Sequence, residues 1–147
     1  LAEAGFRVLC PDMRGYGDSE KPAGGYDGLT LVEDMRQLLR AAGASGKTHV
    51  VGWDMGALPA YLFAAHHPGE VATLAYLDEP LPSVNIAEIS RFARETHGGY
   101  WHFGFNHAID LPELLLAGRE RAFMDYLFGL MSFDPSAIDE EARAEYL

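Results

Sequence analysis

The sequence has 147 residues, 48% of them apolar, which is enough for one domain with a hydrophobic core. Eleven basic against 22 acidic residues give a net charge of −11, and this charge opposes binding to nucleic acid or to an anionic membrane surface. No apolar stretch is long enough to span a bilayer, and one cysteine excludes a disulfide framework. We therefore expect a soluble protein, cytoplasmic or secreted, that binds a small neutral or apolar substrate. Formation of a homo-oligomer stays open.

The ends of the sequence indicate part of a larger fold. Leu1 is not an initiator methionine and begins what reads as the tail of a helix, and Leu147 lies in a helical, acidic stretch. The first apolar run, residues 6–10, predicts a buried strand with Cys10 as a buried thiol. A turn-rich segment, residues 11–28, follows it.

The next element is an amphipathic helix. Thr30 and Glu33 have the spacing of a capping box, and Gly43 marks the end of the helix. Its predicted buried face consists of Leu31, Met35, Leu38, Leu39 and Ala42.

A strand is predicted at residues 48–51, then a helix from about Met55 to His67 that Pro68 ends, then a strand at 73–77. Strands that alternate with helices predict a parallel sheet with right-handed crossovers. The fold class is therefore α/β.

From residue 82 onward the pattern becomes helical. The Gly98-Gly99 pair and the aromatic run at residues 100–105 interrupt it. A helical insertion after an α/β strand is typical of a lid over the strand ends, where ligands of open sheets bind. We thus expect a core at 1–81 and a helical cap at 82–147, with helices at 86–96, 111–116, 119–128 and 134–147.

The most informative motif is Gly52-Trp53-Asp54-Met55-Gly56, between the strand at 48–51 and the following helix. It has the form of a nucleophile elbow with aspartate in the central place, and its two glycines leave room for close backbone. A carboxylate nucleophile suits displacement at an sp³ carbon, because the resulting ester can then be hydrolysed. The alternative is an ordinary turn with Asp54 as a helix N-cap.

The segment from Pro11 to Ser19 completes a resemblance to the α/β-hydrolase superfamily. It matches the D-x-R-G-x-G-x-S loop of that superfamily, and the elbow and the helical stretch follow at the usual distances. Asp12 and Arg14 are expected to hold this loop by ion pairing, with substrate contact as the alternative.

Within the superfamily, the chain is similar to epoxide hydrolases and to fluoroacetate-type dehalogenases, both of which use an Asp nucleophile. The dehalogenases carry two arginines that bind the substrate carboxylate. Met55 and Leu58 stand in those places here, so a carboxylate substrate has no evident clamp. The resemblance also implies that the Met55 N–H forms part of the oxyanion hole.

The run Trp101-His102-Phe103 resembles the W-H-F of a bacterial epoxide hydrolase subgroup, which shares the pattern at residues 117–123. The resemblance implies that His102 donates a hydrogen bond to the epoxide oxygen as the ring opens. A packing role for His102 is the alternative. The residues expected to line the substrate site are Trp53, Tyr100, Trp101 and Phe103.

Asp78, 24 residues after Asp54, resembles the acid that orients the catalytic histidine in both subgroups. Glu79 is a rival, and an Asp that merely begins a proline-rich loop is the structural alternative. The catalytic histidine is expected beyond Leu147, because the other histidines, His49, His66, His67, His97 and His107, do not occupy the matching place.

A metal site and a cofactor are not expected. His66 and His67 are adjacent and so point to different helix faces, and His102 with His107 lacks a carboxylate at ligand spacing. The sequence favours an epoxide hydrolase that gives vicinal diols through an Asp54 ester. The alternatives are a haloalkane-type dehalogenase and a catalytically incomplete fragment or binding module.

Overall fold

The computed structural model describes residues 1–80 and 101–146. The chain divides into two compact units, residues 1–84 and 85–147. No helix in the described ranges has the length and apolar character needed to cross a bilayer.

The first unit is built around a parallel pair of strands, β1 (Thr48–Trp53) and β2 (Val71–Leu77). Both predicted strands are confirmed, and each is two residues longer than expected. A short 3₁₀ turn, η2 (Asp54–Gly56), and helix α2 (Ala57–His66) connect them. A helical crossover of this kind is what a parallel pair requires, because a tight hairpin cannot join parallel strands.

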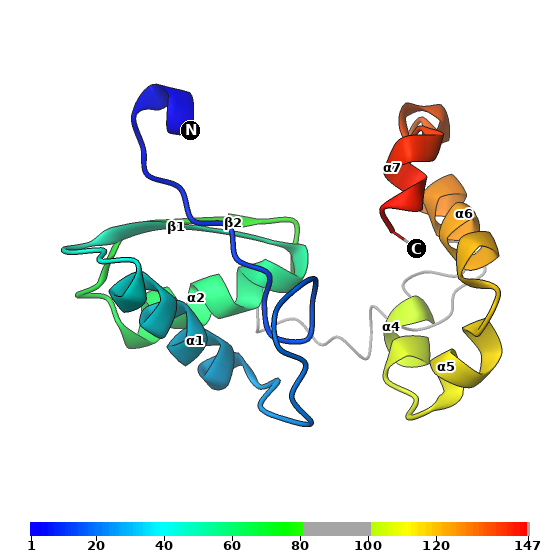
Figure 1. Ribbon diagram of the computed structural model, residues 1–147, viewed down its shortest axis with the longest axis horizontal. Helices are drawn as coiled ribbons and strands as arrows, with labels where there is room; N and C mark the ends of the chain where they lie inside the picture. Colours follow the sequence, from blue (N-terminus) through cyan, green and yellow to red (C-terminus); the bar gives the residue numbers. More distant parts are fainter. Residues whose placement is uncertain (81–100, 147) are drawn as a thin grey trace. The chain divides into compact units, whose positions relative to one another are not determined.

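Helices α1 (Gly28–Ala41) and α2 lie on one side of the two strands (Figure 1). The buried apolar side chains of the described residues are Val32, Ala57, Pro59, Ala60 and Phe63. Val32 is outside the face of α1 that the sequence predicted, whereas Leu38, inside that face, is 36% exposed. Leu38 lies near the C-terminal end of α1, whereas Val32, the buried residue of this helix, lies near its N-terminal end.

The start of α1 differs from the prediction, and its end does not. Asp27 is the N-cap, and its Oδ1 accepts a hydrogen bond from the Thr30 N–H at 3.0 Å. The prediction that Thr30 and Glu33 form a capping box is therefore wrong. The Glu33 carboxylate pairs with Arg36 instead. After the helix, Gly43 has a left-handed φ of 68°, as a helix-ending glycine requires.

Residues 6–10 do not form a strand, although they follow the predicted apolar pattern. A short turn, η1 (Ala2–Ala4), precedes them, and no strand in the described residues lies beside them to complete their hydrogen bonds. Their side chains are exposed, so the prediction of a buried Cys10 is also wrong.

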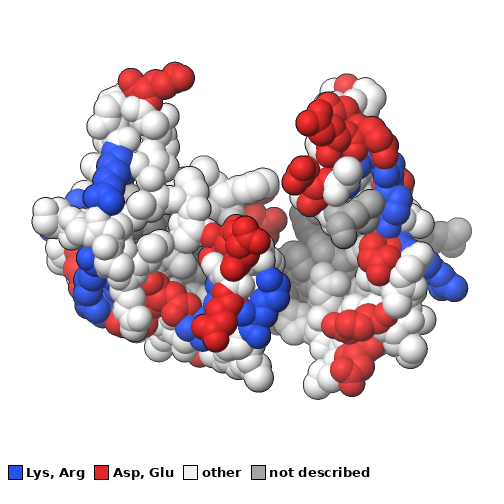
Figure 2. Space-filling model, viewed as in Figure 1, with Lys and Arg blue, Asp and Glu red and all other residues white. Residues whose placement is uncertain are grey.

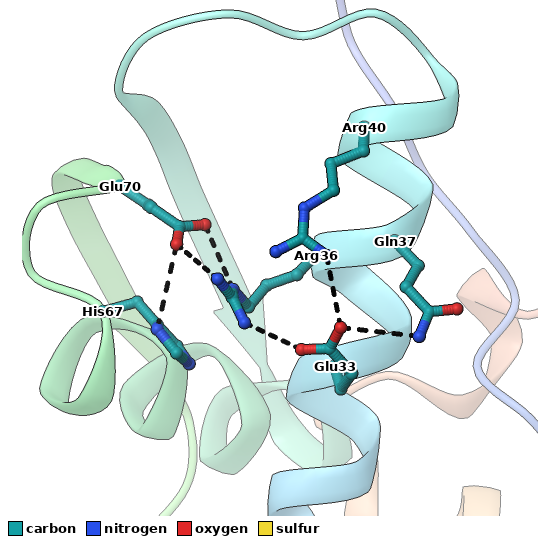
Figure 3. Close-up of polar contacts among 6 residues, drawn as sticks. All are labelled: Glu33, Arg36, Gln37, Arg40, His67 and Glu70. Carbon is teal, nitrogen blue, oxygen red and sulfur yellow. Dashed lines mark hydrogen bonds and ion pairs between the residues drawn. The ribbon is translucent and has the colours of Figure 1, made fainter.

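A network of charged side chains ties α1 to the turn before β2 (Figure 3). The Arg36 guanidinium donates to both carboxylate oxygens of Glu70, at 2.6 and 3.1 Å, and to Glu33 at 2.8 Å. His67 Nδ1 lies 3.8 Å from Glu70. Hydrogen bonding from Arg36 lowers the pKa of Glu70, because it favours the charged carboxylate.

The second unit is helical in its described part. Its elements are α4 (Trp101–Asn106), α5 (Leu111–Leu116), α6 (Glu120–Met131), η4 (Pro135–Ala137) and α7 (Glu140–Ala144). The aromatic run was expected to interrupt the helices, but most of it forms α4. The single helix predicted at 134–147 is instead the η4 turn followed by the short α7, while the helix predicted at 86–96 lies outside the described residues.

Two kinds of contact hold this unit together. Arg143 of α7 pairs with Asp125 of α6, and Arg121 donates to Asp125 and to Glu140. An aromatic cluster joins α4 to α6 through rings 5.8 to 6.3 Å apart, and its members are Trp101, Phe105, Phe123 and Tyr126. Acidic side chains stand out on the visible face of both units (Figure 2), as the net charge requires.

Candidate active site

Asp54 directly follows β1 at a sharp turn into α2. Its φ is 50°, a left-handed conformation that costs an L-residue on the order of 1 kcal/mol. A Cβ at Gly52 would lie 2.5 Å from the Gly56 carbonyl oxygen and 2.7 Å from Ala57 Cα, so only glycine fits there. Gly56 has open space where its Cβ would be, so just one of the two glycines is sterically required. The turn holds an exposed carboxylate in strained backbone.

The alternative of Asp54 as a helix cap is wrong. The N-cap position of η2 is Trp53 and that of α2 is Gly56, and neither helix start has a side-chain cap hydrogen bond. The Asp54 carboxylate is therefore not used to satisfy the helix start.

Asp78 directly follows β2, as Asp54 follows β1. Trp53 pairs with Leu77 in the parallel register, so the two aspartates leave the sheet at the same edge. Asp78 also has a left-handed φ, 55°. Trp53 Nε1 donates a hydrogen bond to Asp78 Oδ2 at 3.4 Å. The two strand ends thus bring together both acids that the sequence selected.

Glu79 adds a third carboxyl group to this edge. Burial raises its pKa, and repulsion from the charges of Asp54 and Asp78 raises it further. Pro80, which follows Glu79, is held by Tyr76: the Tyr76 hydroxyl donates a hydrogen bond to the Pro80 carbonyl oxygen at 2.8 Å. Carboxyl groups at one sheet edge with different burial are a common feature of acid and base sites.

The positions that hold arginines in fluoroacetate-type dehalogenases are apolar and accessible. Met55 is 63% exposed and Leu58 is 40% exposed. Neither side chain supplies a donor for a carboxylate.

Trp101, His102 and Phe103 are consecutive residues of α4 in the second unit. The rings of His102 and Phe103 are 4.6 Å apart, and the Trp101 ring lies 6.1 Å from His102. The predicted site residues therefore fall in both units, and Tyr100 lies outside the described residues.

The loop at residues 11–19 is held by different partners than expected. Arg14 forms a bidentate pair with Asp34 of α1, with both distances 2.6 Å, rather than with Asp12. Asp12 instead accepts a hydrogen bond from the Asp18 N–H, and its carbonyl oxygen accepts one from the Ser19 hydroxyl. The sequence missed Asp34 because its position on α1 shows its charge but not the element that it faces.

Two of the three described histidines of the first unit have partners away from the elbow, and the third, His66, is the last residue of α2. His49 Nδ1 lies 2.8 Å from Thr73 Oγ1, and His67 lies beside Glu70. In the second unit, His107 Nδ1 contacts the Phe103 carbonyl oxygen at 2.8 Å. Within residues 1–80 and 101–146, no three potential metal ligands come together.

An apolar hollow of about 220 Å³ opens in the first unit. Its walls include Leu9, Met35, Val50 and Phe63, but Asp54 does not line it. The hollow lies between α1, β1 and the unpaired segment before the loop. It is therefore a packing gap and not a substrate pocket for the elbow.

A protein-family model described as "alpha/beta hydrolase fold" matches residues 1–127. A fluoroacetate dehalogenase from Burkholderia sp is 32% identical over 96% of this chain and 47% of its own length. A soluble epoxide hydrolase from Corynebacterium sp. (strain C12) is 44% identical over 53% of this chain and 27% of its own length. The chain thus spans about half, or less, of the curated relatives that it matches.

Solved structures give the same result. The crystal structure of wild-type Cfl2 from Burkholderia cenocepacia matches with a TM-score of 0.74 and 32% identity, over 92% of this chain and 46% of that one. The epoxide hydrolase CorEH without ligand matches with a TM-score of 0.70 and 26% identity, over 92% and 48% of the two chains. Both neighbours are similar across the two units.

Proposed function

Because the chain belongs to the α/β hydrolase fold family, we propose that it is part of a hydrolase that opens epoxides through an ester of Asp54 and releases vicinal diols. The observation that carries this proposal is the elbow: an exposed carboxylate, in left-handed backbone, at the end of β1. Similarity to a soluble epoxide hydrolase supports the substrate class.

In the first step an Asp54 carboxylate oxygen attacks an oxirane carbon, and the C–O bond of the ring breaks. The freed oxygen takes a proton, which we assign to His102 as donor. In the second step water attacks the ester, and the Met55 N–H stabilises the oxyanion. The diol leaves and the Asp54 carboxylate is restored.

Asp78 is the proposed acid that orients the histidine activating the water. It follows β2 at the same end of the sheet at which Asp54 follows β1, and this common position supports the proposed role. Glu79, whose pKa is raised by burial, is the alternative acid at this sheet end. Trp53, Tyr100, Trp101 and Phe103 are proposed to contact the substrate, and residues 82–147 to form the cap.

The base that activates water is not assigned to any described histidine. His49, His67 and His107 have partners elsewhere, His66 is at the end of α2 that is remote from the elbow, and His102 is assigned to the epoxide oxygen. Loss of the general base typically removes several orders of magnitude of rate. We therefore expect this chain to form the ester once and to hydrolyse it very slowly.

Intact-mass spectrometry of the chain after incubation with a reactive epoxide tests the proposal. The expected product is one adduct per chain, with the mass of the added epoxide, on the peptide that contains Asp54. Asp54→Asn should abolish it, whereas the matched change Asp18→Asn, at another exposed aspartate, should not. Adducts spread over several carboxylates, or unchanged in Asp54→Asn, would reject the nucleophile.

A dehalogenase is the second candidate, because the fluoroacetate dehalogenase relative aligns with 96% of this chain. Attack of Asp54 on the substrate carbon would then release fluoride and leave a glycolate ester. Met55 and Leu58 offer no cationic partner for the substrate carboxylate, and losing such a partner typically costs about 2–5 kcal/mol. We expect the epoxide adduct to form at least tenfold faster than the fluoroacetate adduct; the reverse order would favour the dehalogenase.

A further inference from the structure

We propose that Trp53 is a positioning residue whose indole N–H holds the carboxylate of Asp78 in place at the end of β2. The role assigned to Asp78 rests on the proposed function, but the contact between the two side chains does not. Trp53 then does more than contact substrate: it fixes the direction of the acid beside the nucleophile.

The sheet register brings the two residues together. Trp53 of β1 is paired with Leu77 of β2, so Asp78, the residue after Leu77, lies next to the residue that faces Trp53. The left-handed φ of Asp78, 55°, turns the chain at that point. Trp53 Nε1 and Asp78 Oδ2 are 3.4 Å apart. The contact thus joins the end of one strand to the end of the next, next to Asp54.

Packing does not account for the position of Trp53. Its side chain is 65% exposed, whereas an aromatic ring that serves the core is largely buried. An exposed indole that still points its single N–H at a carboxylate is used for that polar contact. The indole N–H can only donate, and a carboxylate oxygen accepts, so the two groups match.

The surroundings of Asp78 make such a donor useful. Asp54 follows the neighbouring strand end, and Glu79 is the next residue in the chain; burial raises the pKa of Glu79, and the charges of Asp54 and Asp78 raise it further. Within the described residues, Tyr76 on β2 and Tyr61 on α2 also lie near these carboxyl groups, with their rings 6.3 Å apart. Neither side chain carries a positive charge. A neutral N–H donor stabilises one chosen carboxylate, without a cation that would also attract Asp54.

Two-dimensional ¹H–¹⁵N spectra of the chain provide the test, because the indole N–H signals of its two tryptophans are separate from the backbone. Trp53→Phe assigns the Trp53 signal by its loss, and the remaining signal belongs to Trp101. We expect the Trp53 signal to shift upfield as pH falls from 7 to 3, because protonation of Asp78 weakens the hydrogen bond. The Trp101 signal is the internal control.

Substitutions then identify the acceptor. Asp78→Asn should remove the pH-dependent shift, and Asp78→Ala should shift the signal upfield at all pH values. Glu79→Gln is the matched control and should preserve the pH-dependent shift. A shift that survives Asp78→Asn but disappears in Glu79→Gln, or no shift at all, would overturn the proposal.

The test needs no substrate, so its outcome is separate from that of the proposed function. An Asp54 adduct without the indole shift would reject the role of Trp53 alone. The indole shift without an adduct would reject the nucleophile and leave the contact established.

Discussion

Different kinds of contact stabilise each of the two units internally. All five buried apolar side chains among the described residues are in the first unit, and they are Val32, Ala57, Pro59, Ala60 and Phe63. The described part of the second unit contains no buried side chain and relies on half-exposed rings and arginine–carboxylate pairs. A sheet with helices on one side encloses side chains, whereas short helices joined at their ends do not.

This difference predicts where substitutions do most damage. Phe63→Ala in α2 should destabilise the first unit by about 3–5 kcal/mol, because the ring is 3% exposed and leaves a cavity. Phe123→Ala in α6 is the matched change in the second unit, and we expect less than half that cost, because its ring is only partly buried. Urea unfolding followed by hydrogen exchange of peptides from each unit measures both. Equal losses would show that the second unit has a core comparable with the first.

The elbow provides a sharper comparison inside the first unit. Gly52→Ala should cost about 1–3 kcal/mol, since its Cβ would meet the backbone of Gly56 and Ala57. Gly56→Ala, where the Cβ meets nothing, should change stability by less than about 0.5 kcal/mol. Thermal unfolding of the two variants checks the difference. Similar melting temperatures would mean that the elbow is looser than its geometry indicates.

The second unit should be more sensitive to acid. Hydrogen bonding from Arg121 lowers the pKa of Asp125 and of Glu140 below their ordinary values of 3.8 and 4.5. A lowered pKa in the folded state gives stability that is present above the unfolded pKa and is lost as pH falls through the folded pKa. Protection of α6 and α7 peptides in hydrogen exchange should therefore decrease below about pH 4.5.

Arg121→Gln serves as the control for that prediction. It removes the Arg121 contacts with Asp125 and Glu140 but leaves Asp125 paired with Arg143, so the acid dependence of the α6 and α7 peptides should decrease. Glu70 in the first unit also has a lowered pKa, but the buried core should keep the α2 peptides protected. An earlier loss of protection in α2 than in α6 would contradict the comparison.

The smallest expected effect is in the loop at residues 11–19. Arg14→Lys keeps the charge but loses the bidentate geometry toward Asp34. The loop should exchange its amides several-fold faster, with little change in the unfolding midpoint. Arg40→Lys is the matched control, because Arg40 makes one 3.3 Å contact with Glu33 and is 59% exposed. Equal amide exchange rates of the loop in the two variants would show that the bidentate pair of Arg14 with Asp34 does not hold the loop.

Some of the site could be predicted from the sequence. The order strand, elbow, helix, strand places Asp54 and Asp78 after successive parallel strands, and parallel strands end at one edge. The structure adds that both aspartates have a left-handed backbone conformation. It also shows that the Trp53 indole N–H donates a hydrogen bond to the Asp78 carboxylate. The contact between Trp53 and Asp78 depends on how β1 and β2 are aligned in the sheet. The sequence alone does not specify that alignment.

What the sequence alone determined about this protein was local: β1, β2, α2, the glycine that ends α1 and the aspartate at the elbow. These follow from periodicity, turn residues and steric limits within a few positions of each residue. Only the tertiary structure decided that Arg14 pairs with Asp34 and that residues 6–10 stay unpaired with Cys10 exposed. A strand needs a neighbour and a charge needs a partner, and both are found through space.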